Sequence, residues 1–309
     1  MRALTIAGRG AAPAVADLPV SHLDAGQVRV AVEAASVNGI DVAAAAGYLW
    51  DRMPHEFPVV LGRDFAGTVD SVGSDVTRWK SGDRVAGVIT AMALGSGAIC
   101  EVVNADATVL VAVPAGLSAL DAAAVGLAGV AATDLIAALG LTVDDVVLVS
   151  GASGGVGAFA VQLAARAGAK VIATARGGDA ARFVRDLGAA EVVDHTEDLA
   201  AQVRAAAPEG LTAVIHAAGD PAQLAALLIS GGRLASVVGA TPDQVGRADV
   251  TTTPVLAVAT PDKLSGLLEA AASGALRVPV ARTYRLDEAP QAISDFASPK
   301  LGKLVIAIR

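Results

Sequence analysis

A glycine-rich turn between a strand and a helix is the first feature of the sequence with recognisable chemistry. A buried-strand pattern at residues 146–150 runs directly into this turn, and a helical pattern follows at residues 157–167. Glycines let the backbone turn sharply beside a pyrophosphate, and the N–H groups and dipole at a helix start favour its negative charge. A glycine-rich turn alone indicates only a tight loop, but in this context it predicts a dinucleotide site. The expected cofactor contacts are Gly151, Ser153, Gly154, Gly155, Val156 and Gly157.

The end of the next strand predicts which cofactor binds. A site specific for NAD carries an Asp or Glu there to hold the ribose 2′-hydroxyl. Here the strand at residues 170–174 is followed by Ala175 and Arg176, and no acid is present. Arg176 can pair with a 2′-phosphate and stack on the adenine, and Thr174 can add a hydroxyl donor. The prediction is NADP(H); the alternative is that Arg176 is only a solvated loop charge.

Alternating strands and helices surround this turn. Such alternation requires right-handed crossovers and a parallel sheet covered on both faces, so the central part is expected to be a doubly wound α/β unit. The further expected strands are 191–193, 213–216 and 233–238, and the further expected helices are 179–187 and 221–228.

The first third and the last part of the chain have a different pattern. Residues 27–34, 67–73, 82–88 and 98–103 read as half-buried antiparallel strands of a compact β unit. Ser118 and Asp121 introduce a long helix at 122–139 that Gly140 ends. The tail predicts helices at 262–272 and 287–296 and a last strand at 303–308.

Composition restricts the class of protein. The chain has 309 residues, 54% of them apolar, and a net charge of -8, which predicts a large core, two domains and no attraction to nucleic acid or anionic membranes. Its one cysteine, Cys100, excludes an internal disulfide and a Cys-rich zinc site. The most apolar stretch, 122–133, is shorter than the roughly 20 residues of a membrane span. The apolar run at the N-terminus is too short for a secretory signal, so a cytoplasmic protein is expected.

Several further motifs together resemble one superfamily over essentially the whole chain. They are the segments 34–41, 57–69, 72–76, 82–85 and 302–305. With the glycine-rich turn, they resemble the medium-chain dehydrogenase/reductase superfamily, in its zinc-independent NADPH:quinone oxidoreductase, zeta-crystallin-like branch. The resemblance implies a GroES-like catalytic domain made from both chain ends, 1–116 and 277–309, and a Rossmann domain at 117–276. It also places the active site in the cleft between the domains, with further cofactor contacts at Ala218, Gly239 and Lys303.

The resemblance also identifies the positions that bind catalytic zinc in other members of the superfamily. Here those positions are Asn38, Arg63 and Asp64. An amide, a guanidinium and one carboxylate do not make a zinc site, because Zn²⁺ prefers thiolate or imidazole and Arg offers no lone pair. We therefore expect no metal.

Without zinc, the chemistry implied by the family is hydride transfer from NADPH to a quinone or to the β-carbon of an enone. The protein must then offer hydrogen-bond donors to the carbonyl oxygen where charge develops. Asn38 is expected to donate either to the nicotinamide ribose or to the substrate carbonyl, with capping of a turn as its alternative. Tyr48 is expected to face the cleft, with plain packing as its alternative, and Asp41 fits a helix cap better than a proton donor. Ala131 stands where relatives commonly carry a Thr, and whether Thr133 replaces it is open.

Two other functions remain open at this point. One is an enoyl reductase of a biosynthetic pathway that acts on a thioester-bound chain; the other is a non-catalytic NADPH-binding structural or sensing protein. The expected partner is a small apolar conjugated carbonyl or quinone. The β-branched segment 249–258 is expected to be an edge strand through which two copies form a homodimer.

Overall fold

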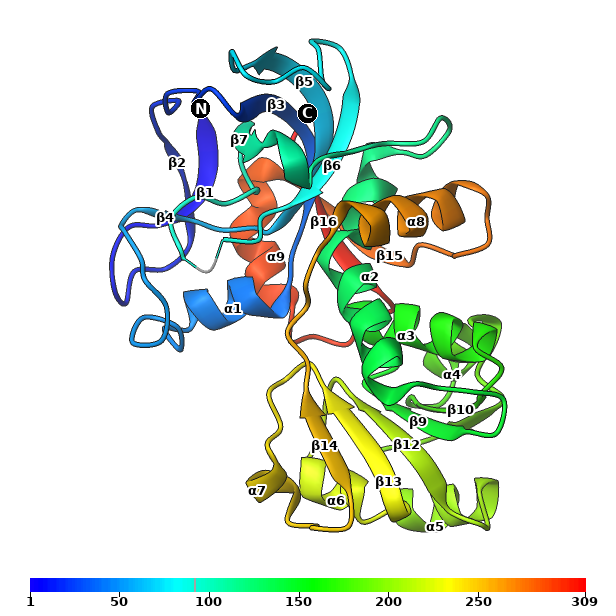
Figure 1. Ribbon diagram of the computed structural model, residues 1–309. Helices are drawn as coiled ribbons and strands as arrows, with labels where there is room; N and C mark the ends of the chain where they lie inside the picture. The colour runs from blue at the N-terminus through cyan, green and yellow to red at the C-terminus, as the bar shows by residue number, and fades with distance from the viewer. Residues whose placement is uncertain (92) are drawn as a thin grey trace. The chain divides into compact units, whose positions relative to one another are not determined.

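The structure is a computed structural model that describes residues 1–91 and 93–309, and it divides into two compact units (Figure 1). Unit 1 comprises Met1–Leu127, Ala259–Pro299 and Lys303–Arg309, and unit 2 comprises Ala128–Val258 and Lys300–Gly302. The sequence-based boundaries assign 117–127 and 259–276 to the nucleotide unit, whereas the structure groups these residues with unit 1. One reason is that α8 (Pro261–Ala272) packs against β8 (Val111–Ala112).

Unit 1 is built on two sheets. The larger has the strand order β15-β16-β3-β5-β6-β8, with β7 paired to β3; the smaller has the order β2-β1-β4. Antiparallel pairing of β3 with β5 and of β5 with β6 confirms the predicted β unit. The remaining strands are β1 (Arg2–Ile6), β2 (Ala14–Asp17), β3 (Gln27–Ser36), β4 (Val59–Val60), β5 (Asp64–Val72), β6 (Arg84–Val88), β7 (Val102–Asp106), β15 (Val280–Arg285) and β16 (Lys303–Ala307), and the helices are α1 (Gly39–Ala45) and α9 (Ala289–Asp295).

A glycine permits the close approach of the two central strands of this sheet. A Cβ added at Gly67 in β5 would lie 2.2 Å from the carbonyl oxygen of Ala31 in β3. Inward-facing residues of β3 are buried at every second position, as expected for a sheet with one face on the core. The sheet therefore holds the ends of β3, β5 and β16 in fixed register, and the polar side chains described below begin at these ends.

Unit 2 is a six-stranded, fully parallel sheet in the order β11-β10-β9-β12-β13-β14. This order and the helices between the strands confirm the predicted doubly wound fold. In sheets of this kind the ligand crevice is expected where the winding reverses, which in this order is the carboxyl end of β9, between β10 and β12. The strands are β9 (Val146–Ser150), β10 (Lys170–Thr174), β11 (Glu191–Val193), β12 (Leu211–His216), β13 (Leu228–Ser236) and β14 (Thr251–Pro254), and the helices are α3 (Gly155–Arg166), α4 (Asp179–Asp186), α5 (Leu199–Ala206), α6 (Pro221–Ala225) and α7 (Pro242–Val245).

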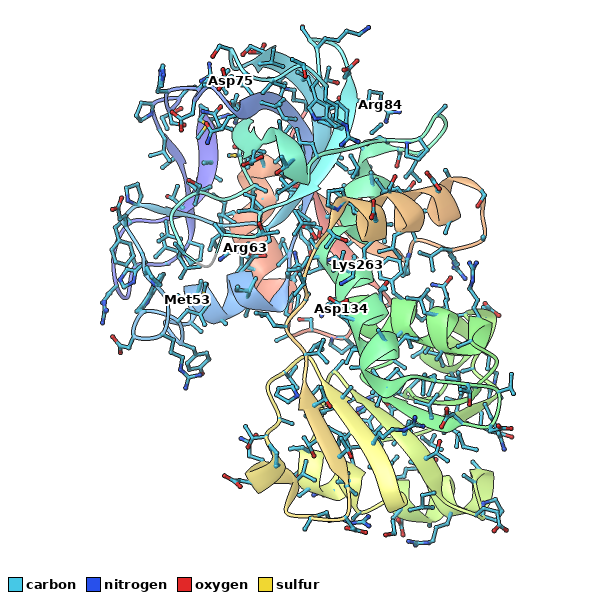
Figure 2. All side chains as sticks on the ribbon, viewed as in Figure 1. Met53, Arg63, Asp75, Arg84, Asp134 and Lys263 are labelled. Atoms are coloured by element: carbon cyan, nitrogen blue, oxygen red, sulfur yellow. The ribbon has the colours of Figure 1, made fainter. Side chains whose placement is uncertain are left out.

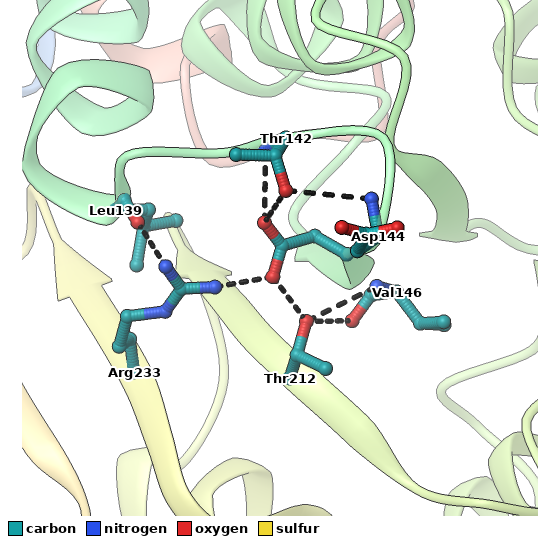
Figure 3. A network of polar contacts seen from close by, with 7 residues as sticks. Leu139, Thr142, Asp144, Val146, Thr212 and Arg233 are labelled. Carbon is teal, nitrogen blue, oxygen red and sulfur yellow. Dashed lines mark hydrogen bonds and ion pairs between the residues drawn. The ribbon is translucent and has the colours of Figure 1, made fainter.

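At the amino ends of the central strands, a polar network surrounds the buried Asp145, whose partners Thr142, Thr212 and Arg233 are labelled in Figure 3. Arg233 from β13 forms an ion pair with Asp145 and donates to the carbonyl oxygen of Leu139 at 2.6 Å. Thr212 from β12 donates to Asp145 at 2.6 Å, and the Thr142 N–H donates at 2.8 Å. Burial opposes ionisation of Asp145, but these hydrogen bonds and the Arg233 charge outweigh it and lower its pKa. The network ties the amino ends of β9, β12 and β13 together, away from the crevice.

Helix α2 (Ala119–Leu139) differs from the sequence expectation in length and shape. Its 21 residues, with a mean hydropathy of 1.9 in the most apolar 18-residue window, are those of a possible membrane span, so the expectation that no segment is long enough was wrong. However, 67% of its most apolar window is buried within the protein, as in the core helix of a globular domain. The helix also breaks at Gly126, where φ is -21° and ψ is -111°.

Several other elements also differ in extent from their predictions. The helix predicted at 221–228 ends at Ala225, because Leu228 already begins β13. The strand predicted at 98–103 is shifted to Val102–Asp106, where it pairs with β3. The edge strand predicted at 249–258 is confirmed at the edge, but it covers only Thr251–Pro254.

Candidate functional site

The glycine-rich turn of unit 2 has the geometry of a pyrophosphate cradle. Gly151 adopts a positive φ of 80°, which an L side chain rarely tolerates. A Cβ added at Gly157 would lie 2.2 Å from the Gly151 carbonyl oxygen, so the helix can approach the turn only with glycine there. Helix α3 begins at Gly155 with Gly154 as its cap residue, and the N–H groups of its first turn have no partner within the helix. Backbone donors and the helix dipole thus meet at the carboxyl end of β9.

Thr174, the last residue of β10, contacts this turn through its hydroxyl. Its hydroxyl accepts a hydrogen bond from the Gly151 N–H at 3.0 Å and lies 3.3 Å from the carbonyl oxygen of Val149. Because Thr174 is buried and its hydroxyl is engaged, the structure does not support the expected donor role toward the cofactor. Thr174 instead shapes the loop that makes the cradle.

Arg176 lies two residues after the end of β10, and its side chain is exposed. The N–H of the next residue, Gly177, donates to Asp194 Oδ2 at 3.4 Å. Asp194, at the end of β11, was missed by sequence reasoning because the expected acid is sought at the end of β10. Hydrogen bonds from Thr196 lower the pKa of Asp194, so its carboxylate is ionised and lies beside the loop that presents Arg176.

The remaining cofactor candidates of unit 2 lie at or near the carboxyl ends of the same strands. The carbonyl oxygen of Ala218, which follows β12, accepts a hydrogen bond from Ser150 Oγ at 2.6 Å. Gly239 follows β13 with a positive φ of 81°. The carbonyl oxygen of Ser153 accepts from the N–H of Gly302 at 2.8 Å. His216 is buried with both ring nitrogens near partners, Ser236 Oγ and the Gly219 carbonyl oxygen, each at 3.0 Å, so it serves this edge of the sheet as a structural residue.

Unit 1 contains a second group of polar side chains, and Asn38 lies at its centre. Asn38 is buried just before α1. Its side-chain Nδ2 donates to Asp64 Oδ1 at 3.1 Å and to the Ser36 carbonyl oxygen at 3.3 Å. Its Oδ1 accepts from Lys303 Nζ at 2.6 Å. A donor role toward a ligand therefore requires that the longer contact, to Ser36, be exchanged for one to the ligand.

Asp64 connects this group to the break in α2. Its Oδ1 also accepts from Ser36 Oγ at 2.7 Å, and its Oδ2 accepts from the N–H of Leu127 at 2.9 Å. A Cβ added at Gly126 would lie 2.4 Å from Asp64 Cβ. Asp64 thus caps the part of α2 that follows the break, and Gly126 leaves the space for it.

Lys303 differs from its predicted role. Its ammonium donates to the Val37 carbonyl oxygen at 2.9 Å and to Asn38, and the side chain is buried, so it is not offered to a cofactor. Burial lowers the pKa of Lys303, while the charges of Asp64 and Asp41 oppose that shift. A lysine at the start of an apolar strand was the sequence signal for a buried cation, but its partners lie more than 260 residues away.

Asp41 completes the group as an internal cap of α1. Its two oxygens accept from the backbone N–H groups of Asn38 and Gly62, both at 2.8 Å. This agrees with the expected capping role, although Asn38 and not Asp41 precedes the helix. Burial raises the pKa of Asp41 to about 6, against the opposing effect of these hydrogen bonds.

The positions that bind zinc in related enzymes do not fit a metal here. Asn38 Oδ1 faces an ammonium, and four donors surround the Asp64 carboxylate. Arg63, labelled in Figure 2, is buried and donates to the carbonyl oxygens of Ala91 and Ala93 at 2.6 and 3.3 Å. Within residues 1–91 and 93–309, no three His, Cys, Asp or Glu side chains are grouped for a metal ion. Burial also raises the pKa of the Cys100 thiol to about 12, which makes it a poor nucleophile or ligand.

The side chain of Tyr48 is exposed, whereas that of Thr133 is hydrogen-bonded within its helix. Tyr48 lies just after α1 and is 72% exposed, so packing within unit 1 does not account for it. Thr133 donates its hydroxyl to the Gly129 carbonyl oxygen at 3.0 Å within α2. Ala131 is buried in the same helix.

Two family models match the chain. Residues 24–115 match the alcohol dehydrogenase GroES-like domain, and residues 155–257 match a domain described as zinc-binding dehydrogenase. The first match covers β3 to β8 of unit 1, and the second covers α3 to β14 of unit 2.

Curated relatives include quinone oxidoreductases and larger synthases. The chain is 32% identical over 227 residues to the chloroplastic quinone-oxidoreductase QR1 of Triphysaria versicolor, covering 71% of this chain and 68% of that protein. It is 36% identical over 207 residues to a chloroplast envelope quinone oxidoreductase homolog of Arabidopsis thaliana, covering 65% and 62%. A mycocerosic acid synthase-like polyketide synthase of Mycolicibacterium smegmatis is 34% identical over 315 residues, covering 92% of this chain and 14% of the synthase. The chain thus spans less than two thirds of the length of the latter two.

Solved structures share the whole fold. An NAD-dependent alcohol dehydrogenase superposes with a TM-score of 0.90 at 28% identity, and a mycobacterial protein complexed with NADPH superposes with a TM-score of 0.86 at 29% identity. Both comparisons cover 100% of both chains. Because the two neighbours differ in cofactor, the choice between NAD and NADP must be argued from the residues of this chain.

Proposed function

Because the chain belongs to the quinone oxidoreductase branch of the medium-chain dehydrogenase/reductase superfamily, a family of oxidoreductases, we propose that it is an NADPH-dependent, zinc-independent reductase of quinones or α,β-unsaturated carbonyls. One observation carries the proposal. A pyrophosphate cradle at the carboxyl end of β9 lies beside an exposed Arg176 at the end of β10, where an NAD site would carry an acid.

The residues of unit 2 fit NADPH. Bound NADPH would supply the hydride, and the first turn of α3 would hold its pyrophosphate. Arg176 would pair with the 2′-phosphate, which NADH lacks, while Asp194 holds the loop at Gly177. The charge of Asp194 opposes a second anion nearby, so Arg176 also serves to offset it.

Donors from unit 1 would act on the substrate. Hydride addition to a conjugated acceptor places negative charge on a carbonyl oxygen, and a donor aimed there lowers the barrier. We propose Asn38 and Tyr48 for this role. Asn38 would release its 3.3 Å contact to Ser36, and the exposed phenol of Tyr48 would turn toward the substrate. Water would supply the final proton.

The proposal also covers the substrate, the cellular location and the assembly of the protein. The substrate would be a small, apolar conjugated carbonyl or quinone, the protein would act in the cytoplasm, and two copies would form a homodimer. The absence of a fitting zinc site supports metal-independent chemistry, so activity should survive exhaustive chelation.

The test is consumption of NADPH with a panel of quinones, enones and enoyl thioesters. Turnover of quinones or enones, with a higher kcat/KM for NADPH than for NADH, supports the proposal. Asn38→Ala should then lower kcat and kcat/KM together by roughly 10- to 1000-fold, as for loss of an oxyanion donor, and Tyr48→Phe should cost less. If Asn38→Ala weakens NADPH binding but keeps the single-turnover rate, Asn38 holds the cofactor instead.

A second candidate is an enoyl reductase that acts on a thioester-bound chain. The polyketide synthase relative favours it, because the match covers 92% of this chain. Turnover limited to enoyl thioesters would select this function, and NADPH binding without turnover of any acceptor would indicate a non-catalytic NADPH-binding protein.

A further inference from the structure

Lys303 presents an unusual polar arrangement in unit 1. A buried ammonium is costly unless it is hydrogen-bonded and its charge is compensated. Here its hydrogen bonds go to one main-chain carbonyl, that of Val37, and to one side chain, that of Asn38. Asp64 and Asp41 lie near enough to act on its charge, but neither forms an ion pair with it in the described part of the chain.

The two carboxylates do not need Lys303 as a hydrogen-bond donor. Asp64 receives four hydrogen bonds, from the N–H and Oγ of Ser36, from Asn38 Nδ2 and from the Leu127 N–H. Asp41 receives two, from the N–H groups of Asn38 and Gly62. The side chain that accepts a hydrogen bond from Lys303 is therefore that of Asn38, and its other acceptor is the main-chain carbonyl of Val37.

Lys303 and Asp64 act on opposite ends of the Asn38 amide. The ammonium lies 2.6 Å from Oδ1, and the carboxylate lies 3.1 Å from Nδ2. If the amide were rotated by half a turn, its N–H₂ would face the ammonium and its oxygen would face the carboxylate. One contact would then bring two donors together, the ammonium and the N–H₂, and the other would bring two acceptors together, the carboxylate and the amide oxygen. The charges of Lys303 and Asp64 therefore favour the observed orientation of the amide.

We infer that Lys303 is a positioning residue that fixes the side-chain amide of Asn38, with its N–H₂ directed away from the ammonium. A cation on the amide oxygen also draws electron density from the nitrogen, which makes the N–H₂ a stronger donor. Where it concerns the rate, this inference rests on the proposed function, because Lys303 would act on the substrate only through Asn38.

The composition of the chain offers a direct probe of this orientation. The sequence contains only two asparagines, Asn38 and Asn104. Protein labelled with ¹⁵N on asparagine side chains therefore gives two amide groups in an NMR spectrum. Asn104 serves as an internal control, because its Nδ2 is bonded to Ser21 and His22 and it has no contact with Lys303.

The variant to compare is Lys303→Met, with Lys80→Met as the matched control. Lys80 is an exposed lysine of unit 1. In Lys303→Met, hydrogen exchange of the Asn38 side-chain amide should become at least about tenfold faster, the factor expected for loss of one hydrogen bond to a charged group. Exchange at Asn104 should not change, and Lys80→Met should leave both amides as in the wild type.

Unchanged exchange at Asn38 in Lys303→Met would overturn the inference. Equal acceleration at Asn38 and Asn104 would also overturn it, because that result indicates general loosening of the unit. If Lys303→Met does not fold, Lys303→Met/Asp64→Asn is compared with Asp64→Asn alone, because the change at Asp64 is then common to both proteins. Faster exchange at Asn38 in the double variant, with Asn104 unchanged, supports the inference, and equal exchange at Asn38 in the two proteins overturns it.

The kinetic arm separates this inference from the proposed function. Lys303→Met should lower the single-turnover rate of hydride transfer while the Kd for NADPH stays within about twofold of the wild type. If the wild type oxidises no NADPH with any acceptor, the proposed function fails, whereas the exchange measurement still tests the orientation of Asn38.

Discussion

Arg176 is a single exposed side chain on which the choice of cofactor depends. Arg176→Ala should weaken NADPH binding by about 1–3 kcal/mol, the value of a charge-assisted contact, and leave NADH binding nearly unchanged. Titration of both cofactors, followed by fluorescence or calorimetry, measures the difference. Arg204→Ala, an exposed arginine of α5, is the control and should change neither affinity. Equal wild-type affinity for NADPH and NADH would contradict the assignment.

Titration of Asp41 should make the stability of the protein depend on pH. Its pKa is raised to about 6 in the folded protein by burial, with Asp64 adding to the shift and Lys303 opposing it, whereas an unfolded Asp titrates near pH 4. The folded state holds this proton more tightly, so the contribution of Asp41 to stability falls as pH rises from about 4 and becomes constant above about 6. The decrease should be about 2–3 kcal/mol.

Denaturant unfolding of the wild type and of Asp41→Asn, repeated between pH 4 and pH 8, tests this. As pH rises from 4 to 6, the free energy of unfolding of the wild type should decrease relative to that of the variant. Above pH 6 the difference between the two proteins should stay constant. A difference that is the same at every pH would show that the carboxyl does not titrate there.

At the scale of elements, the break in α2 depends on the space left by Gly126. Gly126→Ala should destabilise the protein by about 2 kcal/mol or more, because the new Cβ would displace Asp64 from the Leu127 N–H. Gly266→Ala in α8 is the matched control: no atom lies within 4 Å of its added Cβ, so it should stabilise by about 0.5–1 kcal/mol. Urea unfolding measures both, and equal effects of the two substitutions would reject the role given to Gly126.

The sequence predicted unit 2 better than unit 1, for a physical reason. Each strand from β9 to β11 is a short apolar run followed by a glycine-containing turn or a helix signal, so local pattern sets its limits. In unit 1, β7 is defined by pairing with β3, a strand far away in the sequence, and the residues of β7 alone do not show it.

The candidate site shows the same division. The glycines of the cofactor turn follow from local backbone requirements, and sequence reasoning located them. The partner of Lys303 is Asn38, 265 residues earlier in the chain, and the capping of Leu127 by Asp64 needs a helix break that propensity does not signal. Sequence reasoning therefore placed Lys303 at the cofactor, whereas the fold buries it in unit 1.

At the scale of the whole molecule, β14 leaves an open sheet edge with apolar residues beside it. Leu256 and Val258 follow this strand and are 68% and 56% exposed. We predict a homodimer in which two β14 strands pair about a two-fold axis. Light scattering should give twice the chain mass of 30.5 kDa at micromolar concentration.

Leu256→Asp should shift this dimer toward monomer, because it places a charge in an apolar interface. Val143→Asp is the control: Val143 is 74% exposed on the same unit but far from β14 in the sheet order, and its substitution should leave the dimer intact. A wild-type monomer under these conditions would refute the assembly.

The late position of Lys303 has a consequence for synthesis on the ribosome. Strands β3 and β5, with Asp41 and Asp64, emerge more than 230 residues before the strand that supplies their counter-charge. During that interval β3 lacks its neighbour β16, and Asn38 lacks the cation that orients it. Unit 2, whose main segment ends at Val258, can form its sheet in the meantime. Until β16 has been made, the end of β3 that pairs with it is unpaired, and unpaired strand edges in an incomplete sheet favour aggregation.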